Sequence, residues 1–194
     1  SPLSAKIELI GPLRAETKGN IQKIEAQWNS LTIDASRKLS SSTLVLLQGQ
    51  QIKVKTSTSE KNSEAIEIGK LDTTLNLLKT GDGQETLQAN IDAEAIIAPL
   101  LNQMLGNVSP SKLNLRFDIL SFDALKRGDP SVRLNTWRGK NGALEIHEFS
   151  FTKDRLALEA TGTLRIDALH RPNGQLNARA AGLTSLMEML GLPS

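Results

Sequence analysis

The sequence predicts a β-rich α+β fold, in which one or two curved antiparallel meander sheets carry two or three short amphipathic helices on one face. Three observations support this prediction. Short segments with an apolar residue at every second position recur along the chain, polar turns separate them, and two segments with helical periodicity each follow a pair of strands. The 194 residues suit one domain, 1–194.

The first half of the chain is expected to consist mainly of strands. The alternation predicts them at 6–10, 24–28, 31–33, 44–47, 52–58, 66–68, 71–78 and 85–91. Asn29-Ser30 breaks the alternation and indicates a bulge or a tight turn. Gln48-Gly49-Gln50 and Gly81-Asp82-Gly83 indicate turns, and the polar segment 59–63 indicates a loop.

The periodicity changes to that of a helix at 92–105. One face of this helix would contain Ile97, Leu100, Leu101 and Met104. Asp92 can cap its start and Gly106 can end it. Pro99 either kinks the helix or marks its true first turn.

The second half repeats the strand signals. Strands are expected at 113–119, 144–151, 156–166 and 176–180, and a turn is expected at Lys153-Asp154. Segment 144–151 has apolar residues on both faces, which indicates either a strand covered on both sides or a bulge that switches faces. Asp129-Pro130 predicts the start of a short helix that includes Trp137 and ends at Gly139, and Asn141-Gly142 predicts a turn after it. A C-terminal helix is expected from Leu183, Leu186, Met187 and Leu190.

A spacing occurs twice in the chain. Segments 74–77 and 87–90 are nine residues apart, as are segments 163–166 and 176–179, and the gaps contain the turn dipeptides Asp82-Gly83 and Asn173-Gly174. Each unit runs into a helix-like segment ending in Met-Leu-Gly. The spacing is compatible with a duplication, with halves 1–106 and 107–194, or with a habit that meanders share.

The composition excludes several classes of function. Aromatic residues make up 3%, which counts against stacking on nucleic-acid bases, and the net charge is only +2. Neither Lys53 and Lys55 nor the doublet Lys126-Arg127 forms a basic stripe. Cysteine is absent, so thiolate metal sites and cysteine nucleophiles are excluded. No apolar run approaches the ~20 residues of a transmembrane helix.

Candidate catalytic residues are few. His147 lies in a predicted strand beside Glu148, and His170 lies in a predicted turn near Asp167. The spacing of the two histidines is not that of a metal site, and no phosphate loop or nucleophile elbow is present. Glu145, Glu148 and Glu159 have the spacing of an exposed sheet face. We therefore expect a non-enzyme with no catalytic residues, no cofactor site and no metal site, and we keep a hydrolase using His170 with Asp167 as an alternative to test.

The second half resembles a known family. The resemblance depends on Trp137-Arg138-Gly139-Lys140-Asn141-Gly142, the strand Leu144-Glu145-Ile146, segment 156–166, Pro172-Asn173-Gly174-Gln175-Leu176 and segment 186–190. In this order they resemble an uncharacterised family of alphaproteobacterial envelope proteins, a domain of unknown function, and more loosely the AsmA-like proteins. The resemblance covers about 131–191. It implies a periplasmic domain tied to the inner membrane by a segment before Ser1, a link to lipid traffic, and no catalytic residues to carry over.

Two functions remain open at this point. A curved sheet lined with Leu and Ile can hold an apolar ligand such as an acyl chain, although the same side chains can simply pack against the helices. We therefore expect a non-enzymatic periplasmic domain that binds or senses a lipid or another apolar envelope component. The alternative is a scaffold that binds an envelope protein, which predicts an exposed apolar patch or an unpaired strand edge. The oligomeric state is not predicted.

Overall fold

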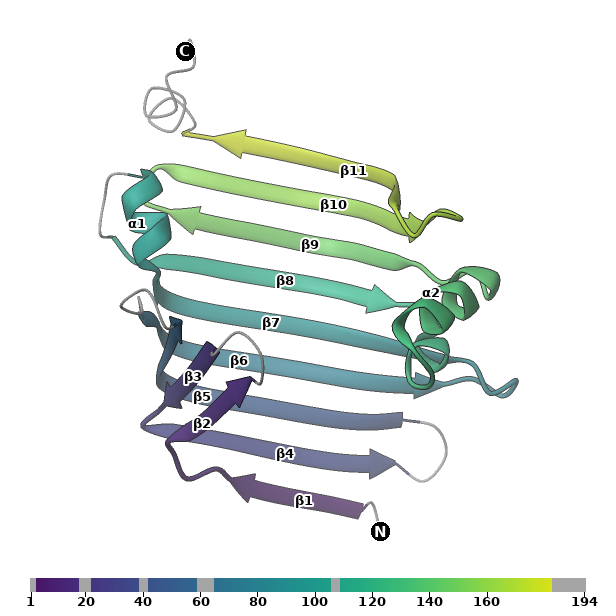
Figure 1. Ribbon diagram of the computed structural model, residues 1–194, viewed down its shortest axis with the longest axis horizontal. Coiled ribbons are helices and arrows are strands. Elements are labelled where there is room, and N and C mark those ends of the chain that lie inside the picture. Colours follow the sequence, from purple (N-terminus) through teal and green to yellow (C-terminus); the bar gives the residue numbers. More distant parts are fainter. Residues whose placement is uncertain (1–2, 18–21, 39–41, 59–64, 106–108, 183–194) are drawn as a thin grey trace.

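The computed structural model describes residues 3–17, 22–38, 42–58, 65–105 and 109–182. Within these ranges eleven strands form one open antiparallel sheet in the order β1-β4-β5-β6-β7-β8-β9-β10-β11, and β2 and β3 extend one end of it by pairing of β3 with β5 (Figure 1). The strands are β1 (Leu3–Glu8), β2 (Leu13–Thr17), β3 (Gln22–Gln27), β4 (Ser30–Lys38), β5 (Ser42–Thr58), β6 (Ala65–Lys79), β7 (Glu85–Ile97), β8 (Ser111–Ile119), β9 (Leu144–Lys153), β10 (Leu156–Ile166) and β11 (Pro172–Ala181). The predicted β-rich α+β class is confirmed.

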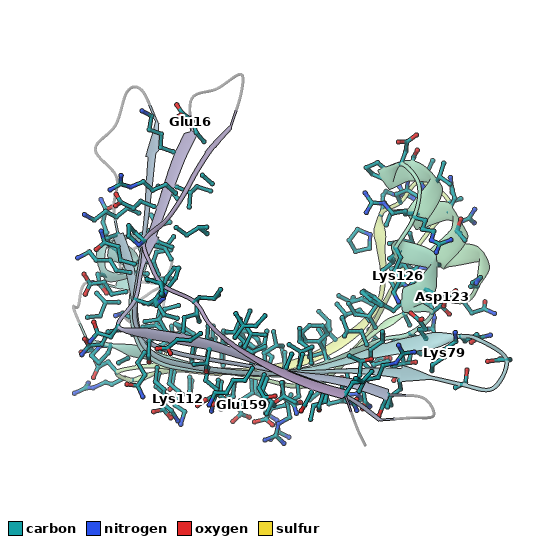
Figure 2. All side chains as sticks on the ribbon, turned by 90° about the horizontal axis from the view of Figure 1, so that it is seen from below. Glu16, Lys79, Lys112, Asp123, Lys126 and Glu159 are labelled. Carbon is teal, nitrogen blue, oxygen red and sulfur yellow. The ribbon has the colours of Figure 1, made fainter. Side chains whose placement is uncertain are left out.

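The sheet is strongly curved, so that it has a concave and a convex face (Figure 2). Three neighbouring strands have an irregular residue at matching positions. Gln51 in β5 and Ala95 in β7 have positive φ values of 50° and 53°, and the ladders on both sides of Gly69 in β6 skip a residue at the same place. Beyond this line, β2, β3 and the adjoining ends of β5 and β6 rise as an arm on one side of the concave face (Figure 2).

The helices lie at the ends of the strands and leave the middle of the sheet uncovered within the described residues. Helix α1 (Pro99–Leu105) lies at one end of β8 to β10, and the 3-10 helix η1 (Phe122–Leu125) with α2 (Pro130–Gly139) lies at the other (Figures 1 and 2). The expectation that two or three helices pack across one face of the sheet is therefore wrong for these two α-helices. The expected C-terminal helix at 183–190 lies outside the described residues, as does the loop at 59–63.

Three sequence predictions of turns and boundaries are wrong. Gln48-Gly49-Gln50 lies inside the continuous strand β5, and Asn173-Gly174 lies inside β11. The expected helix at 92–105 begins only at Pro99, since β7 continues to Ile97, so Pro99 marks the true first turn. Strand β2 had no predicted counterpart.

The bulge considered for segment 144–151 is confirmed. The ladders of β9 with both of its neighbours change register between Ile146 and Phe149, so β9 contains one extra residue at His147-Glu148. The bulge places Leu144 and Ile146 on the same face of the sheet as Phe149 and Phe151, although the first pair has even and the second pair odd residue numbers. The helix predicted from Asp129-Pro130 is also confirmed, with Asp129 at its N-cap position.

The two units with the repeated spacing pair differently. In the first, Leu77 lies opposite Leu87, so segments 74–77 and 87–90 pair with each other. In the second, Ile166 lies opposite Pro172, so segment 163–166 pairs with 172–175. The two units therefore share the spacing of their segments but not the register in which their strands pair. In addition, β7 pairs with β8 across the expected boundary between the two halves.

Buried side chains are few and small. The buried apolar residues of the described chain are Ile52, Ala89, Ala93, Ala98, Ala124, Trp137, Ala143 and Leu156. The chain has an accessible surface of 13121 Å², whereas a compact monomer of 21.1 kDa is expected to have about 9,000 Å². The chain therefore exposes more surface than a compact domain of its mass would.

Candidate functional site: the concave face

Apolar side chains line the concave face from one edge of the sheet to the other. Residues directly opposite in an antiparallel ladder share a face, so the registers define rows that cross the sheet. One row contains Ala5, Ala35, Val45, Leu75, Ala89, Phe117, Ile146, Gly162 and Leu176. The next row contains Ile7, Ile33, Leu47, Thr73, Ile91, Leu115, Phe149, Ala160 and Ala178.

These rows lie on the concave side because the intervening residues point to the convex side. Lys112 of β8 and Glu159 of β10 extend from the convex side of the sheet (Figure 2). Their neighbours Leu113 and Leu158 therefore point to the concave side, where the side chains are almost entirely carbon (Figure 2). The two central rows contain no charged residue and one hydroxyl group, that of Thr73.

The concave face is not covered by a second layer in the described part of the chain. Leu75, Leu115, Phe117 and Phe149 are half-buried even though they lie in the middle of the sheet. Towards the edges the apolar side chains become exposed, with fractions of 52% for Ile7 and 49% for Leu176. At about 4.8 Å between strands, the nine strands from β1 to β11 extend about 38 Å across the sheet. An apolar surface of this size is larger than the scattered apolar residues that monomers normally expose.

The convex face is polar and its groups bond to one another. The Gln48 amide donates to Asp72 at 3.1 Å, and the Lys70 ammonium contacts the same carboxylate at 2.7 Å. The Lys70 hydrogen bond, followed by that of Gln48, lowers the pKa of Asp72. Arg116 contacts Glu148 at 3.3 Å across β8 and β9. This face satisfies its own polar groups and remains wet, as an antiparallel sheet with one solvated face should.

Side chains of Asp118, Glu145 and His147 meet on the convex face at the β9 bulge. His147 Nε2 lies 3.3 Å from Asp118 Oδ2, to which the Gln88 amide also donates at 3.1 Å. One ligand atom from each of the three lies within 4.8 Å of the others, and two carboxylates with an imidazole are a donor set that divalent zinc accepts. The hydrogen bond from Gln88 and the contact with His147 already give this carboxylate partners without an ion.

Sequence reasoning placed His147 beside Glu148, whereas the structure places it beside Asp118 of the neighbouring strand. The bulge is the reason, since it turns the extra residue toward the convex side. Glu145, Glu148 and Glu159 do lie on the wet face of the sheet, as their spacing indicated. The missed partner, Asp118, could have been found only from the register of β8 with β9.

His170 and Asp167 do not form the pair that a hydrolase would need. Asp167 accepts hydrogen bonds from the backbone N–H groups of Leu169 and Arg171 and from the Arg171 guanidinium, and these bonds, the backbone bond of Arg171 first, lower the pKa of Asp167. The His170 ring instead contacts Asn135 Oδ1 at 3.0 Å. Asp167 therefore builds the turn between β10 and β11, and the geometry gives the hydrolase alternative no support.

The comparison with protein families gives a match over nearly the whole chain. A family described as "Uncharacterized protein conserved in bacteria (DUF2125)" matches residues 1–193. The chain belongs to this family. The resemblance noted in the sequence covered only the second half of the chain, whereas this match covers nearly the whole DUF2125 chain. It supports the part of the resemblance that named an uncharacterised bacterial family. The alphaproteobacterial and AsmA-like parts of the resemblance stay predictions.

No curated protein and no solved structure matches the DUF2125 chain. Among the helices of its described residues, none is long and apolar enough to cross a bilayer. The concave face is therefore the feature of the DUF2125 fold from which a function has to be argued.

Proposed function

We propose that the domain is a non-enzymatic part of the bacterial cell envelope, exposed to the periplasm and tied to the inner membrane, that binds lipid acyl chains on its concave face. The observation that carries this proposal is the charge-free pair of central rows on a curved sheet, which no other described element covers. Apolar ligands are held by concave surfaces lined with apolar side chains. The looser resemblance of the second half to AsmA-like proteins supports the proposed location and the proposed link to lipids.

The energetics favour a long flexible chain over a small ligand. Burying one methylene completely is worth about 0.8 kcal/mol, and a chain lying on an open face is covered on one side, so each methylene gains about half of that value. Useful affinity then needs many methylenes in a row, which an acyl chain provides. Thr73 aside, the central rows offer no polar group to a headgroup, so the headgroup would stay at a margin of the face.

Two neighbouring residues on β10 provide the test. Ala160 lies on the concave face opposite Phe149 and Ala178, and Thr161 is the next residue, on the convex face. Ala160→Trp should place an indole ring in a central row of the concave face, one strand in from the β11 edge, and weaken binding of a fluorescently labelled fatty acid at least tenfold. Thr161→Trp, the matched control, should bind as the wild type does. Circular dichroism checks that both variants keep the sheet.

Native mass spectrometry of the purified protein should in addition detect co-purified lipid in the wild type and less of it in Ala160→Trp. Absence of binding by the wild type, or equal loss in both variants, would refute the proposal. The location has its own test, in which alkaline phosphatase, active only after export, is fused after Ala181 in the complete gene product. An inactive fusion would contradict exposure to the periplasm.

A second candidate function is protein interaction without a small ligand. The specific observation that favours it is the edge strand β11, which is ten residues long and exposed throughout. A strand edge without a partner, as β11 has among the described residues, is what the scaffold alternative predicts.

A further inference from the structure

Strand β11 forms one edge of the sheet and leaves one side of its backbone without a partner strand in the described residues. It pairs with β10 alone, from Ala157 opposite Ala181 to Ile166 opposite Pro172, and all of its ten residues are exposed. A strand at an edge presents a row of free N–H and C=O groups, which are a template for another strand. The length of β11 makes this row unusually long for an edge.

The devices that normally protect an edge are almost absent from β11. Arg179 is its one charged residue, and Pro172 lies at its first position, where proline does not interrupt pairing. On the opposite edge, β1 is only six residues long and contains Lys6 and Glu8. The two edges therefore differ, and β11 is the one suited to pairing.

The two faces of the sheet remain distinct up to this edge. Leu176, Ala178 and Ala180 continue the concave rows, whereas Gln175, Asn177 and Arg179 lie on the convex side. A partner strand that pairs with β11 must therefore also be apolar on one face and polar on the other. β11 itself meets this requirement.

We propose that β11 pairs antiparallel with β11 of a second copy of this chain, about a twofold axis perpendicular to the sheet. Such an axis keeps the two concave faces on the same side, whereas a parallel pairing about an axis along the strand would turn one of them over. The pairing is isologous and closes as a dimer. β11 and β1 run in the same direction, so pairing β11 with β1 of the next copy would instead propagate without end.

The sequence of β11 is compatible with pairing to itself. Residues that lie opposite each other must point to the same face of the sheet. The twofold axis must therefore pass through one residue, which lies opposite its own copy, and not between two neighbouring residues. With Asn177 opposite its own copy, Leu176 lies opposite Ala178 and Arg179 opposite Gln175. With Leu176 opposite its own copy, Arg179 lies opposite Asn173. Neither register places two charges of the same sign opposite each other.

Single cysteines test the proposal directly, because the chain has none of its own. Residues directly opposite in an antiparallel pair have Cα atoms about 4.5–5.5 Å apart, which suits a disulfide. Under mild oxidation Asn177→Cys or Leu176→Cys, whichever lies on the axis, should form a covalent dimer. Thr161→Cys is the control, since Thr161 lies opposite Asn177 but one strand inward, so its copies would be about 14 Å apart.

A second measurement follows the equilibrium without a cross-link. Wild-type protein should sediment as a dimer, and Leu176→Glu, which brings two carboxylates close to the axis, should sediment as a monomer. High salt should restore the dimer, because it screens their repulsion. A loss of folding would be seen by circular dichroism and would not be reversed by salt.

The proposal is overturned if wild-type protein sediments as a monomer even at 100 times the protein concentration used for cross-linking. It is also overturned if neither Asn177→Cys nor Leu176→Cys cross-links, or if Thr161→Cys cross-links as readily as they do. It does not depend on lipid, so a failed dimer test leaves acyl-chain binding by a single copy intact. Conversely, a dimer that binds no fatty acid would refute the proposed function and leave the pairing of β11 standing.

Discussion

Gly142 lies directly against the indole ring of Trp137. A Cβ atom at this position would be 2.3 Å from Trp137 Nε1, which donates a hydrogen bond to the Leu120 carbonyl at 2.6 Å. Gly142→Ala must therefore displace the ring from its site between α2 and the sheet. We expect the free energy of unfolding to fall by about 1–3 kcal/mol, measured by urea denaturation.

Gly81 offers the matched control for this substitution. A Cβ atom there would have no neighbour within 4 Å, and its φ does not require glycine. Gly81→Ala should change the free energy of unfolding by less than about 0.5 kcal/mol. Equal effects of the two substitutions would show that the Trp137 contact does not restrict position 142.

Asp123 connects η1 to α2 and gives the fold a dependence on pH. The hydrogen bond from Lys140 Nζ at 2.6 Å is the main cause that lowers the pKa of Asp123, and the Glu85 backbone N–H at 3.3 Å contributes. Because the folded-state pKa lies below the unfolded value, the stabilisation is complete above the unfolded pKa of about 4 and is lost as the pH falls through the folded value.

The midpoint temperature of thermal unfolding should therefore be constant from pH 7 to pH 5 and should fall below about pH 4. Asp123→Asn should lose up to about 1 kcal/mol at pH 7 and show a smaller loss between pH 4 and pH 2. Lys140→Gln, which removes the partner of Asp123, should have a similar effect at pH 7. A variant that keeps the full acid sensitivity of the wild type would contradict the assignment to Asp123.

The extra residue of β9 can be removed without disturbing the alternation of the strand. Without His147 the sequence from Leu144 to Lys153 alternates regularly, and the ladders with β8 and β10 become continuous. Deletion of His147 should therefore give a folded protein whose free energy of unfolding lies within about 1 kcal/mol of the wild type. Circular dichroism and urea denaturation check this outcome.

Deletion of Asn114 from β8 is the control, because β8 pairs with β9 without an extra residue at that position. It moves one part of the strand by one residue and turns apolar side chains to the convex face. We expect this deletion to prevent folding. If the His147 deletion is equally harmful, the bulge itself, and not the alternation, stabilises β9.

Two wrong turn predictions share one physical cause. The sequence predicts turns at Gly49 and Gly174, but both residues lie within strands. A Cβ at Gly49 would be 2.6 Å from the Ile52 side chain, and one at Gly174 would be 2.0 Å from the Thr163 carbonyl. These glycines permit close approach of neighbouring groups. A single sequence cannot distinguish this use of glycine from a turn, because both need the missing side chain.

The alternation in the sequence was sufficient for most strands and for the apolar composition of one face, and the Asp129-Pro130 start signal was sufficient for the helix that follows it. The alternation was not sufficient for β5 and β7, where the positive φ of Gln51 and Ala95 breaks the period of two inside a continuous strand. The candidate site was predictable as an apolar strip of Leu and Ile. Whether helices cover that strip depends on contacts between distant segments, and local periodicity contains no information about them.

The concave face, which no described helix or strand covers, should be visible in the thermodynamics of the whole molecule. Compact proteins of this length unfold with a heat-capacity change of about 2.3–2.9 kcal/mol/K. Because the folded chain already exposes 13121 Å², unfolding should expose roughly a fifth less surface than for a compact chain. We expect calorimetry of the ligand-free protein to give a heat-capacity change lower by about this fraction. A value in the usual range would mean that the concave face is covered in solution.

The first and last strands of the sheet, β1 and β11, lie at opposite edges (Figure 1). A force applied between Leu3 and Ala181 therefore acts mainly across the strands. It loads the hydrogen bonds of the outermost ladders one after another, whereas a force along the strands would load a whole ladder at once. Under tension the domain should come apart strand by strand, inward from its two edges, at low force. It would then act as an extensible link between whatever is attached at its two ends.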